Sequence, residues 1–265
     1  MAAASHDPRS RRLVGLLSLV GALILVAAAV AIVRSLDDGP VETAPATTTT
    51  TEPPTTTVPK PQPVVPVSTQ LATPKGEVPT FDKPGGTQIG KVGLWYGYKM
   101  TTPVVEREPS GVWLRVMLPE RPNGSTAWVR SSDVTLSSTP YRIVLKLGET
   151  RTHVYKDGFE IFNVPVGIGR DRTPTPQGTF FVAVIEKPGH AGYGPVVLDL
   201  NAHSEAIQSW QGMGDAITAF HGPFGAQDII KSGGGKVSNG CVRMLNEDQL
   251  KMGVITLGTP VDIVA

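Results

Sequence analysis

The only cysteine among the 265 residues, Cys241, lies in a context typical of a reactive thiol. It belongs to the hexapeptide Ser-Asn-Gly-Cys-Val-Arg at 238–243, which closely follows three consecutive glycines at 233–235. Glycine has no Cβ to shield its neighbours, so such a loop can turn backbone N–H groups toward a bound oxyanion. A free cysteine has a pKa of about 8.5, and attack on a carbonyl at neutral pH therefore needs a neighbouring base or positive charge. The context predicts a nucleophilic thiol with a base near it.

The best candidate for that base is His221. It ends the apolar run 216–220 and opens a glycine-bearing loop, whose far end, twenty residues later, is Cys241. A cysteine and a histidine brought together at the two ends of one loop is the arrangement that thiol catalysis requires. From the residues alone, two alternatives remain, His190 and His203.

These residues resemble the YkuD class of L,D-transpeptidases. The family motif is a histidine-glycine pair, a loop of variable length, and then Ser/Thr-x-Gly-Cys-Val/Ile-Arg. His221-Gly222 and residues 238–243 match its two halves, and residues 175–180 match a second family signature, Thr-Pro-x-Gly-x-Phe. The resemblance covers residues 140–265. It implies a mostly β fold, a YkuD-like β-sandwich with one or two short helices.

The resemblance also implies a reaction, acyl transfer within peptidoglycan. Cys241 would attack the carbonyl of the third, diamino acid residue of a stem tetrapeptide, expel the terminal D-alanine and form a thioester. A side-chain amine of a neighbouring stem would then take the acyl group and complete a 3-3 cross-link. The implied partners are peptidoglycan stem peptides and, as inhibitors, carbapenem β-lactams. No cofactor and no metal ion are expected.

The resemblance assigns a role to each residue of the predicted catalytic set. His221 would act on Cys241 as general base and then as general acid. The backbone N–H groups of Gly240 and Cys241 would form the oxyanion hole. Ser238 or a nearby carbonyl would orient the imidazole, as the third member of a catalytic triad does.

A further set of residues is predicted to bind substrate. Arg243 would either steady the nucleophile loop or meet a substrate carboxylate. Many family members carry histidine where this chain has Asn239, a departure that concerns substrate selectivity more than chemistry. Residues 186–214 lie where the family has a flexible covering segment over the acyl-donor site, with an ordinary surface insertion as the alternative. The set consists of Gly222, Tyr193, Asn239 and Arg243.

Three other functions stay open at this point. In thiol hydrolases of cell-wall peptides the cysteine usually precedes the histidine, whereas here His221 precedes Cys241. A non-enzymatic wall-binding protein would leave Cys241 inert. A zinc site made of His203, His221 and Cys241 would lack the close ligand spacing and the second cysteine common in such sites.

The residues that must position this chemistry, 139–265, form the predicted catalytic domain. Apolar and polar residues alternate over 142–147, and Lys-Asp-Gly at 156–158 is a turn signal for a β-hairpin. Asn246 and Gln249 are spaced for a capping box at the start of a short helix. Further strands are expected at 152–155, 159–166, 179–185, 196–200 and 260–264.

Residues 77–138 form a second predicted folded segment. The turn signals Pro-Gly-Gly, Pro-Ser-Gly and Pro-Asn-Gly interrupt its short strand-like runs. Residues 113–118 alternate in character, and Ala-Trp-Val follows at 127–129. The segment resembles a small bacterial SH3-like β-barrel. It would serve either as an accessory module that packs against its neighbour or as a wall-binding module.

The amino-terminal part predicts a membrane anchor. Residues 13–33 carry no charge over 21 residues, which at about 1.5 Å per residue span a hydrocarbon core of about 30 Å. Three arginines precede this run, so the positive-inside rule places residues 1–12 in the cytoplasm. A single-pass cell-membrane protein would result, with its catalytic domain on the extracytoplasmic, cell-wall side. The alternative is a cleaved signal peptide, because residues 27–31 offer Ala-x-Ala spacings.

Composition predicts a spacer after the anchor and excludes one class of partner. Residues 34–76 are rich in threonine and proline, and because proline locks φ and lacks a backbone donor, this composition favours a solvated, disordered linker. The whole chain has 24 basic and 23 acidic residues, a net charge of +1. Nonspecific electrostatic binding of nucleic acid is therefore not expected.

Overall fold

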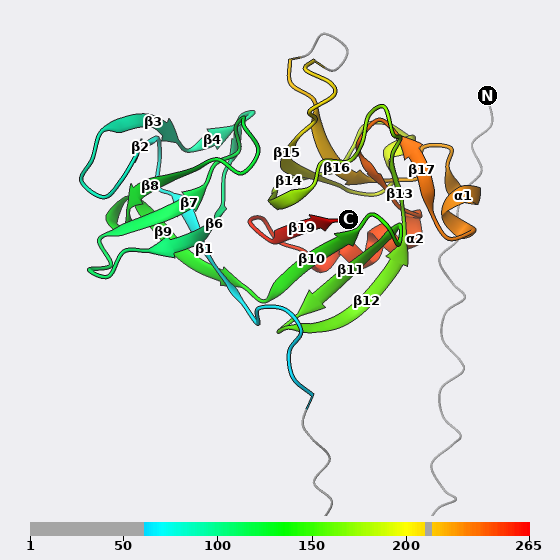
Figure 1. The fold of residues 1–265 in the computed structure, drawn as a ribbon, viewed down its shortest axis with the longest axis horizontal. Coiled ribbons are helices and arrows are strands. Elements are labelled where there is room, and N and C mark those ends of the chain that lie inside the picture. Colours follow the sequence, from blue (N-terminus) through cyan, green and yellow to red (C-terminus); the bar gives the residue numbers. More distant parts are fainter. Residues whose placement is uncertain (1–60, 210–213) are drawn as a thin grey trace, which may run out of the picture. The chain divides into compact units, whose positions relative to one another are not determined.

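The computed structural model describes residues 61–209 and 214–265, and these fold mainly as β-strands (Figure 1). Most strands belong to two larger sheets, one of seven strands and one of ten. The α-helices of the described ranges are short, α1 at Gln227–Lys231 and α2 at Asn246–Lys251. The predicted fold class, mostly β with one or two short helices, is confirmed.

The predicted cytoplasmic tail (1–12) and membrane helix (13–33), and most of the predicted linker, lie outside the described residues. Over 61–209 and 214–265, no helix has both the length and the apolar character needed to cross a bilayer. The anchor therefore stays a prediction.

The seven-stranded sheet is formed by the segment predicted as a separate β module. Its strands pair antiparallel in the order β3-β2-β8-β7-β6-β1-β9. Buried side chains such as Leu114, Val116 and Val129 form its hydrophobic core. An SH3-like topology for the module stays a prediction. The strands are β1 (Thr69–Pro74), β2 (Val78–Phe81), β3 (Gln88–Val92), β6 (Thr102–Arg107), β7 (Trp113–Met117), β8 (Thr126–Arg130) and β9 (Val134–Thr139), with a separate hairpin of β4 (Leu94–Trp95) and β5 (Tyr98–Lys99).

The first strand of this sheet corrects the predicted boundary between linker and module. β1 lies within the segment assigned to the linker, which was expected to extend to residue 76. Leu71 in this strand pairs with Pro103 of β6 on one side and with Ser137 of β9 on the other. Leu71 and Ala72 are also buried. The backbone of β1 finds its hydrogen-bond partners far along the chain, and this outweighs the linker-like threonine and proline content.

The ten-stranded sheet is formed by the predicted catalytic domain. Its order is β12-β11-β10-β19-β14-β15-β16-β18-β13-β17. The predicted hairpin is present between β11 and β12, where Asp157 and Gly158 have φ of 52° and 82°. Phe180, Leu200 and Phe220 lie in the core of this sheet. The strands are β10 (Tyr141–Lys146), β11 (Arg151–Lys156), β12 (Phe159–Pro165), β13 (Gly167–Gly169), β14 (Gly178–Glu186), β15 (Val197–His203), β16 (Ile217–His221), β17 (Gly235–Ser238), β18 (Val242–Arg243) and β19 (Pro260–Val264).

Strand β14 contributes side chains to both hydrophobic cores. Phe180 and Val182 belong to the core of the ten-stranded sheet. Phe181 and Ala183, which point to the other face, belong to the core of the seven-stranded sheet. The two sheets therefore share apolar packing through alternate residues of one strand.

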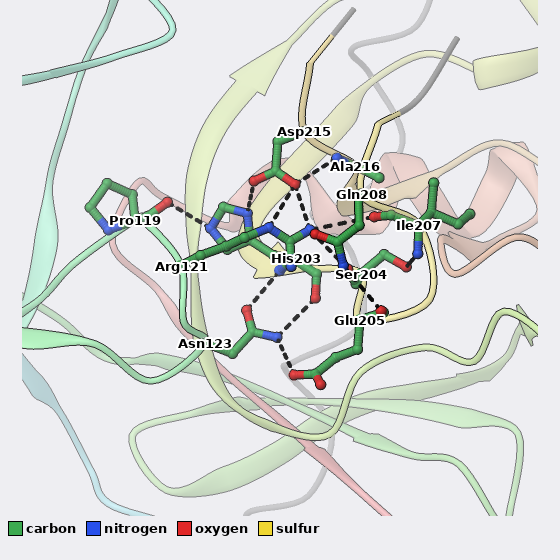
Figure 2. A network of polar contacts seen from close by, with 10 residues as sticks. All are labelled: Pro119, Arg121, Asn123, His203, Ser204, Glu205, Ile207, Gln208, Asp215 and Ala216. Atoms are coloured by element: carbon green, nitrogen blue, oxygen red, sulfur yellow. Dashed lines mark hydrogen bonds and ion pairs between the residues drawn. The ribbon is translucent and has the colours of Figure 1, made fainter. Parts of the chain in front are cut away.

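A polar network joins the β module to the segment that follows β15 (Figure 2). We call it the inter-sheet network and define it by Arg121, Asn123, His203 and Asp215. Arg121 forms an ion pair with Asp215, and Asn123 exchanges two 2.8 Å hydrogen bonds with the backbone of His203. Asp215 is in turn bonded to the imidazole of His203.

The predicted capping box at α2 is wrong. Leu245 occupies the N-cap position and makes no side-chain cap. The Gln249 side chain instead donates to the carbonyls of Tyr193 and Val196, at 3.2 Å and 2.5 Å. It therefore ties α2 to the segment that precedes β15.

Candidate active site

Cys241 lies in the turn between β17 and β18, and the side chain of Ser238 closes that turn. The Ser238 hydroxyl donates to the Cys241 carbonyl at 2.6 Å and accepts the Gly240 N–H at 3.1 Å. Gly240 has φ of 124°, a conformation that L side chains rarely adopt. Two predicted roles are therefore wrong. Ser238 does not orient the imidazole, and the Gly240 N–H is engaged by Ser238 and not presented to an oxyanion.

Thr175, known from the sequence only as part of the second family signature, clamps the same turn. Its hydroxyl donates to the Gly240 carbonyl at 2.8 Å and accepts the Gly169 N–H at 2.9 Å. The Gly240 carbonyl and the Cys241 N–H belong to one planar peptide and point in opposite directions. By holding the carbonyl, Thr175 directs the Cys241 N–H away from itself. The predicted role of the Cys241 N–H in the oxyanion hole stays a prediction.

The pairing of β16 with β18 brings His221 and Cys241 to the same face of the sheet. The two strands are parallel, and Phe220 pairs with Val242, both in the hydrophobic core. By this register Cys241 is level with Ala219. Side chains alternate between the faces of a strand, so His221 and Cys241 lie on the face opposite to that core.

A hydrogen bond selects the tautomer of His221. Its Nδ1 lies 2.8 Å from the carbonyl oxygen of Gly222, which can only accept, so Nδ1 carries the hydrogen and Nε2 keeps the lone pair. Burial, together with the positive charge of Arg243, lowers the pKa of His221 to about 4. The imidazole is thus neutral at physiological pH and can accept a proton through Nε2. The nearby carbonyl predicted as an alternative orienting group is the one observed.

The thiol of Cys241 is partly exposed and is held among backbone carbonyls. Its Sγ lies 3.9 Å from the carbonyl oxygen of Ile217. Desolvation raises the pKa of Cys241, and the negative charge of Asp199 raises it further. A hydrogen bond with the backbone of Ala219 and the positive charge of Arg243 act in the opposite direction but do not outweigh the rise. Since the thiol pKa is raised and that of His221 is lowered, the resting pair is neutral. The proton must pass to His221 as sulfur attacks.

Gly222 and Tyr193, predicted to bind substrate, pack against the histidine. The Gly222 N–H donates to the Tyr193 carbonyl at 2.7 Å. A Cβ at Gly222 would lie 2.7–2.8 Å from backbone atoms of residues 192–194, so only glycine allows this approach. The Tyr193 ring lies edge-on to the His221 ring, with centroids 4.9 Å apart. The glycine of the histidine-glycine pair thus has a packing role, and substrate binding by Gly222 and Tyr193 stays a prediction.

Arg243 and Asn239 are both engaged within the protein. The Arg243 guanidinium lies over the ring of Phe224, 5.5 Å from its centroid, and donates to the Phe224 carbonyl at 3.4 Å. The Asn239 side-chain oxygen accepts a 3.4 Å hydrogen bond from Arg170. Arg243 is thus tied to the loop that follows β16, and both of its predicted roles stay predictions. Phe224 and Arg170 belong to no motif and could not be found from the sequence.

The histidines left as alternatives lie elsewhere. His203 belongs to the inter-sheet network, with Nδ1 on Asp215 and Nε2 on the Pro119 carbonyl at 2.9 Å. Both of its nitrogens are occupied, which leaves none to ligate the zinc ion considered above. Within the part of the chain that the structure describes, no three His, Cys, Asp or Glu side chains are grouped to hold a metal. His190 packs on Tyr193, with ring centroids 6.1 Å apart.

The chain is similar to known L,D-transpeptidases. Residues 140–263 match the family model of the YkuD L,D-transpeptidase catalytic domain. The YkuD protein of Bacillus licheniformis is 30% identical over 126 residues, which are 47% of this chain and 66% of that relative. An L,D-transpeptidase from Mycobacterium smegmatis is 16% identical, with a TM-score of 0.36, over 62% of this chain and 90% of that one. L,D-transpeptidase 3 from Mycobacterium tuberculosis, solved with a faropenem-derived adduct, is 15% identical, with a TM-score of 0.39, over 62% of this chain and 91% of that one. Residues 140–263 are thus similar to the catalytic domain of the L,D-transpeptidase (YkuD) family.

Proposed function

We propose that the chain is a peptidoglycan L,D-transpeptidase that forms 3-3 cross-links through a thioester on Cys241. The observation that carries this proposal is the hydrogen bond from His221 Nδ1 to the Gly222 carbonyl. It leaves Nε2 as the basic nitrogen on the sheet face that also bears the only thiol of the chain. A neutral base and a thiol on one face are what acyl transfer by cysteine requires.

The first half of the reaction loads the enzyme. The Cys241 sulfur attacks the carbonyl of the third residue of a stem tetrapeptide while its proton moves to His221 Nε2. The Cys241 N–H stabilises the oxyanion that forms. Collapse breaks the bond to the terminal D-alanine, whose amine takes the proton back from His221. The product is a thioester and free D-alanine.

The second half transfers the acyl group to a side-chain amine of a neighbouring stem. The amine adds to the thioester carbonyl, and the carbon–sulfur bond breaks as the new amide forms. His221 takes a proton from the attacking nitrogen and returns it to sulfur, the reverse of its role in loading. The thiol and the neutral imidazole are thereby restored.

The proposed location is the cell membrane, with the catalytic domain on the cell-wall side. The uncharged run 13–33 and the arginines before it support this orientation. Fractionation of cells expressing the full chain tests it. Membrane-bound protein with an intact amino terminus is expected, whereas a mature form that begins near residue 32 would contradict the anchor.

Intact-mass analysis tests the proposed reaction. Full-length protein incubated with tetrapeptide wall fragments should gain the mass of the fragment minus D-alanine, and a carbapenem should add its whole mass. The Cys241→Ala variant should gain neither mass and should keep its fold, because Cys241 lies in a turn and not in the hydrophobic core. Loading by wild type without any cross-linked product would instead favour hydrolysis of wall peptides.

A further inference from the structure

Three neighbouring strands place a carboxylate and the nucleophile in one row. Asp199 of β15 pairs directly with Ala219 of β16, and Cys241 immediately precedes Val242 of β18, which pairs with Phe220, the residue after Ala219. Directly paired residues share a sheet face, so Asp199 lies on the same face as the thiol and His221. The charge of Asp199 acts on the Cys241 thiol, which agrees with this proximity. The reaction derived above gives Asp199 no role.

The surroundings of Asp199 are acidic. The titratable groups that act on it or feel its charge are Glu186 from β14, Cys241 from β18 and Tyr98 from β5. The Tyr98 hydroxyl donates to Glu186 at 3.1 Å, so the β4–β5 hairpin reaches this side of the site. Burial, with the charge of Glu186, raises the pKa of Asp199 to about 7. A carboxylate with that pKa accepts a proton at neutral pH and releases it again.

We propose that Asp199, assisted by Glu186, binds the ammonium group of the acyl acceptor beside the Cys241 thioester and removes one of its protons. This inference rests on the proposed function and concerns its second half. An alkyl amine has a pKa of about 10.4, so the acceptor arrives at neutral pH as a cation that cannot attack. Two carboxylates attract that cation, and His221 by itself has too low a pKa to deprotonate it.

The proton balance of the transfer step needs two acceptors. The ammonium nitrogen carries three protons, and the amide product keeps one. The first proton passes to the Asp199 carboxylate and frees the lone pair that forms the carbon–nitrogen bond. The second passes through His221 to the sulfur as the carbon–sulfur bond breaks. The products are an amide, a thiol and a protonated Asp199, which then loses its proton to solvent.

The test compares two nucleophiles on the loaded full-length protein. One is the side-chain amine of a diamino acid, which is a cation at neutral pH, and the other is hydroxylamine, which is uncharged. The Asp199→Asn variant should load Cys241 with a tetrapeptide fragment within twofold of the wild-type rate. It should transfer to the charged amine at least tenfold more slowly and to hydroxylamine within twofold. With the charged amine, the wild-type rate should level off above about pH 7, where Asp199 is ionised, whereas the Asp199→Asn rate should keep rising about tenfold per pH unit with the fraction of free amine.

Two further variants are measured alongside Asp199→Asn, one as a matched control and one to test Glu186. Asp157→Asn makes the same chemical change in the β11–β12 turn, where φ of 52° suits asparagine, and should behave as wild type in every arm. Glu186→Gln should slow transfer to the amine about threefold. Thermal unfolding should show no loss of stability for Asp199→Asn, because burial opposes the ionised form of Asp199.

Several results would overturn the inference. The first is an unchanged rate of transfer to the charged amine in Asp199→Asn. The second is an equal loss of rate with hydroxylamine, and the third is an equal loss in the rate of loading. The second and third would indicate a purely structural role for Asp199. If wild-type Cys241 never loads, the proposed function fails, and this inference fails with it. Normal wild-type loading and transfer with any of the first three results overturns the role of Asp199 alone.

Discussion

His221 and His203 lie on neighbouring strands of one sheet, and both are buried, but their surroundings differ in kind. His221 makes one side-chain hydrogen bond, from Nδ1 to the Gly222 carbonyl, and keeps a lone pair on Nε2. His203 lies between two acceptors, the Asp215 carboxylate at Nδ1 and the Pro119 carbonyl at Nε2 (Figure 2). Neither acceptor can donate, so His203 is engaged at both ring nitrogens, whereas His221 is engaged at Nδ1 alone.

The difference distinguishes a candidate base, His221, from a structural residue, His203. Burial would raise the pKa of Asp215, but the hydrogen bond from Arg121 and the charge of His203 outweigh it and lower the pKa. Asp215 is therefore ionised, with Arg121 and His203 as its partners, which compensates its burial. His221 has no such compensation and stays neutral. Removal of His203 should cost stability, and removal of His221 should cost activity.

The largest effect is expected for His221→Ala. Without its base, the neutral thiol should react with a carbapenem 10² to 10⁴-fold more slowly, the range of a lost general base. The rate of adduct formation by intact mass measures this, and thermal unfolding checks the fold. A rate within threefold of wild type would mean that another group activates Cys241.

His203→Ala should show the opposite pattern. The buried Asp215 and the Pro119 carbonyl would lose their partner, at a cost of about 2–4 kcal/mol of unfolding free energy. For a folded part of this size, that corresponds to a fall in melting temperature of about 4–16 °C. Carbapenem acylation should stay within threefold of wild type. A large loss of acylation in a folded His203→Ala protein would contradict the division of roles.

A smaller effect is expected at Thr175, which holds the Gly240 peptide without touching substrate. Thr175→Val keeps the shape but removes both hydrogen bonds, and acylation should fall about tenfold, or about 1.4 kcal/mol of barrier. Thr175→Ser keeps the hydroxyl and should retain most of the rate. Equal losses in the two variants would mean that packing of the threonine methyl, and not the clamp, matters.

The smallest effect is expected from pH. Because the pKa of His221 is lowered to about 4, the base is already neutral above about pH 5, and the raised thiol pKa keeps Cys241 protonated through neutrality. The rate of carbapenem acylation should therefore vary less than twofold between pH 5.5 and pH 8, because both pH values lie about one unit or more from the ionisations of His221 and Cys241. Alkylation by iodoacetamide, which needs free thiolate, should rise about tenfold per pH unit over the same range. Parallel profiles would indicate a preformed thiolate–imidazolium pair.

Local sequence features predicted part of this fold well. The β11–β12 hairpin follows from its Lys-Asp-Gly turn, because two residues with positive φ suffice to reverse the chain. β1 was missed, since its partners β6 and β9 lie about 30 and 65 residues away and its own composition is that of a linker. Gln249 was misassigned for the same reason: its spacing suits a cap, but the segment before β15 offers it two carbonyls.

By itself, the sequence determined the chemical parts of the site. One thiol in a glycine-rich turn and one histidine at the other end of a loop specify a nucleophile and its base, because few other residue types can perform those roles. Only the tertiary structure decided how those parts are held. The orienting carbonyl of Gly222, the clamp by Thr175 and the row from Asp199 to Cys241 depend on which strands lie side by side. Backbone groups look alike in every sequence, so their hydrogen-bond partners emerge only when the sheet has formed.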